Sequence, residues 1–133
     1  MDGDAALQDM IARCSALEGF AAEVAAEAAP LVEEAARRTA RAGTDPEGRP
    51  WAPRKKDGGR ALANAADHVT AVAVGPRVDI VLTGPEAIHQ RGAGKTLPAR
   101  RVIPDGSAGV PAAITEACAT AARTVFQRRM GGT

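Results

Sequence analysis

The sequence predicts a small α+β protein in which a long broken N-terminal helix and a C-terminal helix pack on a small antiparallel sheet, with long irregular loops. Apolar residues recur at helical spacing over residues 4–41 and 110–129, which predicts the two helices. Two β-branched runs flank a turn within residues 68–83, which predicts a hairpin. The 133 residues suit a single domain.

The first helix is expected over residues 4–41. Steps of three and four place its apolar residues on one face. These residues are Leu7, Met10, Ile11, Cys14, Leu17, Phe20 or Ala21, Val24, Ala28, Leu31, Val32 and Ala35. Because Pro30 has no backbone N–H, we expect a kink or two abutting helices at that position. Gly43 fits the end of the helix.

Residues 42–66 are expected to form a loop, because prolines and glycines cluster there without any period. Trp51 lies in this loop between Pro50 and Pro53. A tryptophan is costly to leave in water, so we expect it to anchor the loop onto the body of the protein or onto a neighbour.

The hairpin is expected over residues 68–83, with a turn at Gly75-Pro76-Arg77. On its second strand Val78, Ile80 and Leu82 share one face, which suits a sheet covered by helices on one side. Two strands alone are marginally stable, so we expect further pairing within the loops or between subunits.

Residues 84–109 are expected to form a second irregular loop, and residues 110–129 the final helix, with Pro111 near its first turn. The apolar face of this helix carries Ile114, Cys118, Ala121, Ala122 and Val125, with Phe126 as a further candidate. Both cysteines fall on apolar helix faces, where we expect them to behave as small core residues.

Composition excludes several classes of protein. The net charge of +1 argues against a free-standing nucleic-acid binder, and only three residues are aromatic, which leaves few platforms for stacking bases. Two cysteines do not make a disulfide framework. Unbroken apolar runs are far shorter than the roughly 20 residues of a membrane span, so no membrane partner is expected.

No motif predicts catalysis, a metal or a cofactor. Gly92-Ala93-Gly94-Lys95-Thr96 looks like the end of a phosphate-binding loop, but His89 stands where the first glycine is required, and Pro98 opposes a helix start. The two cysteines and two histidines are expected on four different elements, which disfavours a metal site or a thiol nucleophile. The sequence therefore predicts that the protein is not an enzyme and holds no cofactor.

Charge is divided unevenly along the chain. Residues 1–41 hold eight acidic and four basic side chains, and the remainder holds eight acidic and thirteen basic ones. The basic residues gather in two loop clusters, which are Arg49, Arg54, Lys55, Lys56 and Arg60, and then Arg91, Lys95, Arg100 and Arg101. Three interpretations stay open: a solvated surface, head-to-tail contact between copies, or the lining of a channel through which DNA passes.

Two segments carry a resemblance to a known family. Asp45-Pro46-x-Gly48-x-Pro50-Trp51-x-Pro53 resembles the "dPdGtpWapl" signature of the phage virion morphogenesis family, the tail-completion proteins of Mu-like and other tailed phages. Ile88-His89-Gln90-x-Gly92 and Leu97-Pro98-Ala99-Arg100 resemble its "iHqfG…iPaRpfl" signature. The order of the segments and the flanking helices also match, so the resemblance covers residues 10–128. Arg91 and Arg101-Val102 depart from the signature.

The resemblance implies a structural virion protein at the head–tail junction, assembled in the bacterial host cytoplasm. It implies tail completion or termination and head–tail joining, as a subunit of a ring, expected to be a hexamer, in contact with neck and tail-tube proteins. A neck adaptor or stopper, a head-morphogenesis factor and a small DNA-binding protein stay open as alternatives. Subunit or partner contacts are expected at Trp51, His89, Gln90, Arg91, Pro98, Arg100 and Arg101. Contacts with a DNA channel or an acidic partner are expected at Arg54, Lys55, Lys56 and Lys95.

Two of these residues have a specific expected role. His89 and Gln90 are expected to form hydrogen bonds with loop backbone. Arg100, placed on an extended segment by Pro98, is expected to pair bidentately with a carboxylate of a neighbouring copy.

Overall fold

The computed structural model describes residues 3–54, 58–59, 61–90, 92, 99–106 and 109–131. The helices are α1 (Gly3–Ala16), α2 (Phe20–Ala42) and α3 (Ala112–Gly131), and the strands are β1 (Val69–Val74) and β2 (Arg77–Leu82). Two short 3₁₀ helices, η1 (Ala65–His68) and η2 (Pro85–Gln90), flank the hairpin. Helices combined with an antiparallel sheet confirm the α+β class.

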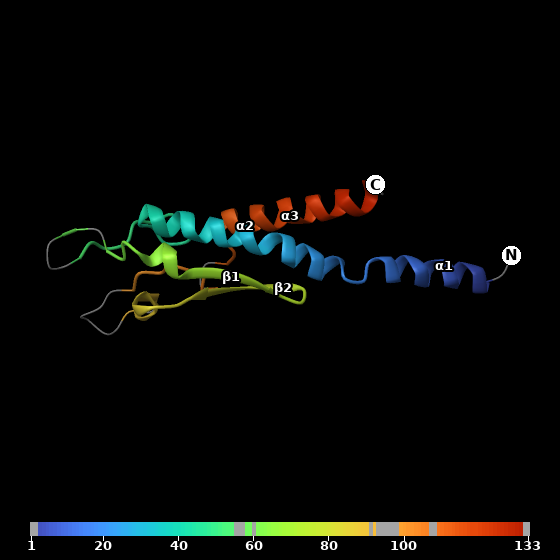
Figure 1. The fold of residues 1–133 in the computed structure, drawn as a ribbon, viewed down its shortest axis with the longest axis horizontal. Coiled ribbons are helices and arrows are strands. Elements are labelled where there is room, and N and C mark those ends of the chain that lie inside the picture. Colours follow the sequence, from blue (N-terminus) through green and yellow to red (C-terminus); the bar gives the residue numbers. More distant parts are fainter. Residues whose placement is uncertain are drawn as a thin grey trace.

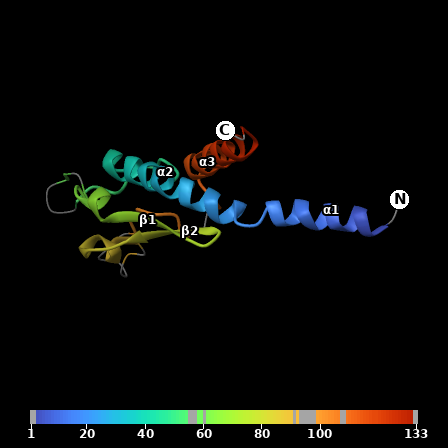
Figure 2. The same cartoon turned by 45° about the vertical axis from the view of Figure 1, so that its right-hand side comes forward.

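The body of the protein has three layers, with α2 in the middle (Figures 1 and 2). The hairpin lies against one side of α2, and α3 packs along its other side. In both views α1 extends beyond the end of this body, nearly in line with α2 (Figures 1 and 2). The N-terminal helix was expected to pack on the sheet. Of its two parts, α2 packs on the sheet and α1 does not.

The break in the N-terminal helix lies at residues 17–19 and not at Pro30, where it was expected. Gly19 takes a left-handed conformation with φ of 76°, which a glycine adopts without steric cost and which ends α1. Pro30 lies inside α2 on its exposed side, and it removes only one backbone hydrogen bond there. Buried Ala28, Ala29 and Val32 hold this stretch of α2 in place by packing.

The hairpin pairs β1 with β2 through a two-residue turn at Gly75-Pro76, with Val69 opposite Leu82 and Val74 opposite Arg77. Two side chains of α2 bind the backbone of β1. Glu33 accepts a hydrogen bond from the Ala71 N–H at 3.0 Å, and Arg37 donates to the Val69 carbonyl at 2.9 Å. Because these contacts use backbone groups of β1, any further strand would have to pair along β2.

The core is thin. Among the described residues, every buried apolar side chain of the core is alanine or valine, and the largest are Val32, Val69, Val102 and Val125. The expectation that both cysteines are core residues is wrong, since Cys14 and Cys118 are exposed. Phe126 is also exposed, because the buried face of α3 is formed by Ala121 and Val125.

Candidate functional site

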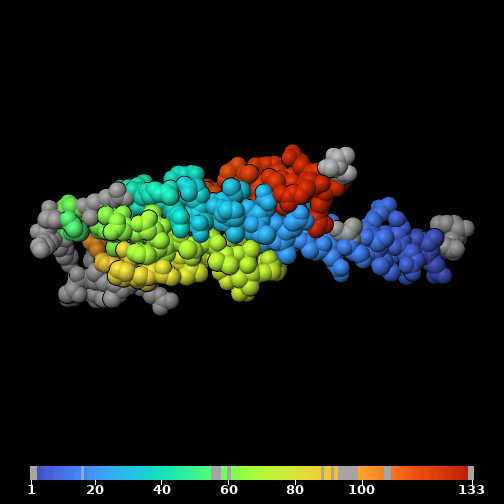
Figure 3. All heavy atoms as spheres, in the orientation of Figure 1, coloured from blue at the N-terminus to red at the C-terminus, as the bar shows by residue number. Residues whose placement is uncertain are grey.

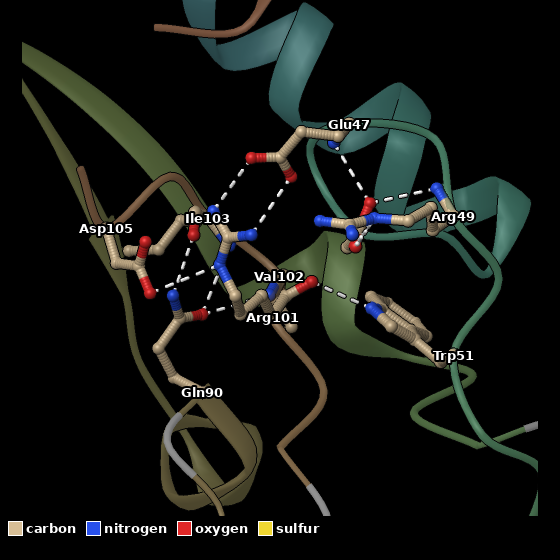
Figure 4. Close-up of polar contacts among 9 residues, drawn as sticks. Glu47, Arg49, Trp51, Gln90, Arg101, Val102, Ile103 and Asp105 are labelled. Atoms are coloured by element: carbon tan, nitrogen blue, oxygen red, sulfur yellow. Dashed lines mark hydrogen bonds and ion pairs between the residues drawn. The ribbon is translucent and has the colours of Figure 1, made fainter. Parts of the chain in front are cut away.

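The two sequence segments that resemble the phage signatures meet in one place. Residues 43–54 follow the C-terminal end of α2, residues 85–90 form η2, and residues 99–105 return between them (Figure 4). We call the contact among these three segments the loop junction. The side chains of Trp51, Gln90 and Arg100 bind backbone groups of another segment, so each of these three residues holds two segments together.

Asp45 organises the first segment. Its Oδ1 accepts hydrogen bonds from the N–H groups of Glu47 and Arg49 at 3.0 and 2.9 Å, and its own N–H donates to the Arg49 carbonyl at 2.8 Å. Gly48, with φ of 89°, turns the chain back in a conformation that favours glycine. The Asp-Pro-x-Gly part of the motif is thus a closed turn, which directs the following Trp51 onto the body.

Trp51 joins the first segment to the third. Its indole Nε1 donates to the Arg101 carbonyl at 2.7 Å (Figure 4). The ring packs against a buried cluster that includes Ala36, Ala40 and Val102. Of the two roles expected for Trp51, the structure shows the anchoring of the loop onto the body of its own chain.

Arg100 makes the second connection between the same segments. Its Nε donates to the Ala52 carbonyl at 2.7 Å, and its Nη2 donates to the Pro53 carbonyl at 3.0 Å. Its Nη1 lies 3.3 Å from His89 Nδ1, and its backbone N–H donates to the His89 carbonyl at 2.7 Å. The residue is only 5% exposed. A pairing with a carboxylate of a neighbouring copy stays a prediction, and it would compete with these inward contacts.

Gln90 holds the third segment against η2. Its Oε1 accepts hydrogen bonds from the Val102 and Ile103 N–H groups at 2.9 and 3.2 Å, and its Nε2 donates to the Ile103 carbonyl at 2.7 Å (Figure 4). The carboxamide therefore satisfies backbone N–H and carbonyl groups of Val102 and Ile103, as a neighbouring strand would. This is the contact with loop backbone that was expected for Gln90.

Arg101 closes the junction on its other side. Its two terminal nitrogens donate to the two carboxylate oxygens of Glu47 at 3.1 and 3.0 Å, and its Nε lies 3.1 Å from Asp105 Oδ2 (Figure 4). The bidentate hydrogen bond with Glu47 raises the pKa of Arg101 above its usual range. Glu47 lies within the first motif, but it was not among the contact residues expected from the sequence.

A second pair of groups lies next to the loop junction. His68 Nδ1 lies 2.7 Å from Glu86 Oε2, and Glu86 is buried. Gly84, with φ of 76°, passes so close that a Cβ there would lie 3.0 Å from Glu86 Oε2 and 3.1 Å from the His68 ring. The sequence analysis assigned no partner to His68, because His68 and Glu86 belong to different elements and no fixed spacing relates them.

The surroundings of His89 disfavour the charged form of its imidazole. Burial lowers the pKa of its imidazole, and the positive charge of Arg100 lowers it further, while Glu86 acts in the opposite direction. The neutral form suits the geometry, because Arg100 always carries its protons and Nδ1 must then accept. A shallow hollow of about 190 Å³ opens beside this residue, lined by Leu62, Pro85, Glu86 and His89.

Five of the residues expected to contact a partner lie together in the loop junction, and they are Trp51, His89, Gln90, Arg100 and Arg101. Arg54 lies at its edge, where its N–H donates to the Gly59 carbonyl at 2.9 Å. The other residues expected to contact a partner or DNA lie outside the described residues, and they are Lys55, Lys56, Arg91, Lys95 and Pro98.

Many of the charged groups are paired within the chain. Arg49 lies 3.2 Å from Asp45, and Arg101 is bound by Glu47. On α2, Glu23 and Glu27 bind Arg128 at 3.2 and 3.1 Å. Over the described part of the chain, no group of three or more His, Cys, Asp or Glu residues is arranged to hold a metal ion, and no helix has the length and apolar character of a membrane span.

The geometry of the junction is that of a structural clamp, because its side-chain donors and acceptors bind backbone groups and one another.

Comparisons of this chain with protein-family models, curated proteins and solved structures give no match.

Proposed function

We propose that this chain is a structural protein of a tailed phage or a phage-derived particle, acting in tail completion or termination and in head–tail joining as one subunit of a ring. Its place is the head–tail junction of the virion, after assembly in the bacterial host cytoplasm. It performs no catalysis. Its partners are copies of itself, expected in a hexamer, and the neighbouring neck and tail-tube proteins.

One observation carries this proposal. The two segments that carry the resemblance bind each other, through the Trp51 indole on the Arg101 carbonyl and the Arg100 guanidinium on the carbonyls of Ala52 and Pro53. Two motifs more than 30 residues apart in the chain therefore form one structural unit. Such a clamp supports loops that project from a small body, which is what a ring subunit needs to meet its neighbours.

Three of the described loop arginines favour protein contacts over a DNA-binding function. The arginines at positions 49 and 101 are paired with carboxylates of the same chain, and Arg100 is buried. Paired or buried cations release few counterions when DNA approaches, so they contribute little to DNA affinity.

The test is electron microscopy of lysates from a phage or prophage in which this gene is deleted. Full heads beside detached, overlong tails would support a tail terminator. Detached tails of normal length would support a joining factor that acts after termination, and an absence of full heads would support the head-morphogenesis alternative. Complementation with the wild-type gene is the control.

Intact infectious particles from the deletion would refute the proposal. DNA binding would then be tested by titration at low and moderate salt, and an affinity that falls steeply with salt would support the DNA-binding alternative.

A further inference from the structure

Helix α1 carries an apolar face that nothing in the described chain covers. Leu7, Met10 and Ile11 of α1 are between 48% and 62% exposed, and Leu17, in the turn just after the helix, is 67% exposed. They follow one another at the spacing of a single helix face, together with the exposed Cys14. The whole helix stands away from the body of the protein (Figure 3). Apolar faces of this kind mark contact surfaces in soluble proteins.

The body offers an unfilled apolar groove. It has a volume of about 500 Å³ and lies between α2, the hairpin and α3. Its walls include Val24 of α2, Val78 and Ile80 of β2, and Ile114 and Cys118 of α3. Every residue that lines it is apolar or cysteine, so the groove suits an apolar helix face and not a charged ligand.

The turn between α1 and α2 keeps α1 away from the groove of its own chain. Residues 17–19 are fixed by backbone hydrogen bonds, among them the Phe20 N–H on the Leu17 carbonyl at 3.0 Å. Arg129 of α3 lies against this turn: its Nη2 is 3.4 Å from the Glu18 carbonyl, and its guanidinium stacks 5.4 Å from the centre of the Phe20 ring. Folding α1 back over its own groove would break these contacts.

We propose that α1 of one copy docks into the apolar groove of the next copy, so that each subunit both donates a helix and receives one. The contact is head-to-tail, because the donating and receiving surfaces differ, and repeated contacts of this kind close into a ring when the rotation permits. The inference deepens the proposed function, on whose ring assembly it rests, by naming the surface that joins the subunits.

The first test compares Ile11→Glu with Ala12→Glu. Ile11 lies on the apolar face of α1, and Ala12 is one residue away on the opposite face, so the two variants add the same charge to the same helix. The oligomeric state of each is measured by light scattering after gel filtration. We expect the wild-type protein and Ala12→Glu to associate and Ile11→Glu to elute as a monomer.

The second test uses the two native cysteines, because Cys14 lies on the α1 face and Cys118 lines the groove. A short bismaleimide is expected to give covalent dimers and higher species on a denaturing gel. Cys14→Ser and Cys118→Ser should each abolish them, because the expected bridge needs one cysteine of each kind. An internal bridge within a monomer would show that α1 folds onto its own chain and would overturn the inference.

The two proposals fail differently. If Ile11→Glu associates as the wild-type protein does, docking of α1 is overturned but ring assembly is not. If the wild-type protein stays monomeric at high concentration, docking of α1 is also overturned. The function in tail completion is decided separately, by the phenotype of the deleted phage. Overlong detached tails together with normal assembly of Ile11→Glu would therefore retain the function and reject the docking.

Discussion

The loop junction and helix α1 differ in whether their large side chains are buried against their own chain. At the junction, Trp51 and Arg100 are turned inward, and both donate to carbonyls of their own chain. On α1, Leu7 and Met10 are exposed to the extent of 52% and 62%. The side chains of the loop junction make their contacts within a single chain, whereas α1 leaves its apolar surface unburied.

This difference separates residues that fold the subunit from residues available to a partner. A side chain whose groups are satisfied inside the chain contributes mainly to the stability of the subunit. An apolar helix face in water gains free energy only when another surface covers it. Substitutions at the junction should therefore lower the stability of the subunit, and substitutions on α1 should leave it nearly unchanged.

The largest expected effect is that of Trp51→Ala. It removes both the packing of the indole against the alanine-rich core and its hydrogen bond to Arg101, and we expect the free energy of unfolding to fall by about 3 kcal/mol. Trp51→Phe keeps most of the packing and should cost about 1 kcal/mol. Urea denaturation measures both effects. Equal effects of the two variants would show that packing of the aromatic side chain at position 51 does not contribute to stability.

Gly84→Ala should have the next largest effect, a loss of about 2 kcal/mol of unfolding free energy. The added Cβ meets a left-handed backbone and also approaches Glu86 and the His68 ring. Gly75→Ala is the matched control, since its φ is also positive but nothing lies within 4 Å of its Cβ. Thermal unfolding of both variants measures the difference, and a Gly75→Ala variant that is equally destabilised would assign the whole effect to the backbone.

A smaller effect is expected from pH. Because the folded protein lowers the pKa of His89 from 6.5, the unfolded chain binds the proton first as the pH falls. This contribution to stability is present above about pH 6.5 and is lost as the pH falls through the pKa of the folded state. His89→Gln keeps a group that accepts from Arg100 but does not titrate, so its stability should fall less between about pH 7.5 and about pH 5. Identical pH profiles of the two proteins, measured by urea denaturation, would argue against this role of His89.

The smallest effect on the subunit is expected from Ile11→Glu. Because Ile11 is 48% exposed and lies outside the core, the free energy of unfolding at low protein concentration should change by less than about 0.5 kcal/mol. Urea denaturation of dilute protein measures it, with Ala12→Glu as the control. A loss comparable to that of Trp51→Ala would mean that α1 packs on its own subunit, and the contrast between the two regions would be lost.

Much of the fold follows from local sequence signals. Helical spacing predicted the helices, Gly43 marked the end of α2 correctly, and β-branched residues around Gly75-Pro76 predicted the hairpin. The position of the helix break was not predicted correctly, because a proline on the exposed side of a well-packed helix costs only one hydrogen bond while the left-handed Gly19 ends α1. Helical spacing also marked Cys14 and Cys118 as core residues, but spacing identifies a face and not what covers it.

The candidate site was predicted in part. Motif residues such as Trp51 and Gln90 were identified from sequence, but their partners were not, because the atoms they bind are carbonyls and amides that carry no sequence signal. Glu47 and Glu86 were missed for a related reason. Each is paired with a side chain distant in the sequence, at Arg101 and His68, and no fixed spacing connects them.

By itself, the sequence determined the α+β class, the hairpin and the residues that give the two loops their motifs, since these depend on local spacing and on residues with restricted backbones. Only the tertiary structure decided that these loops bind each other and that the first apolar helix face lies outside the core. Both depend on which surfaces meet when the hairpin and α3 pack against α2. Burial is a property of that arrangement in space, and local spacing specifies only which residues share a face.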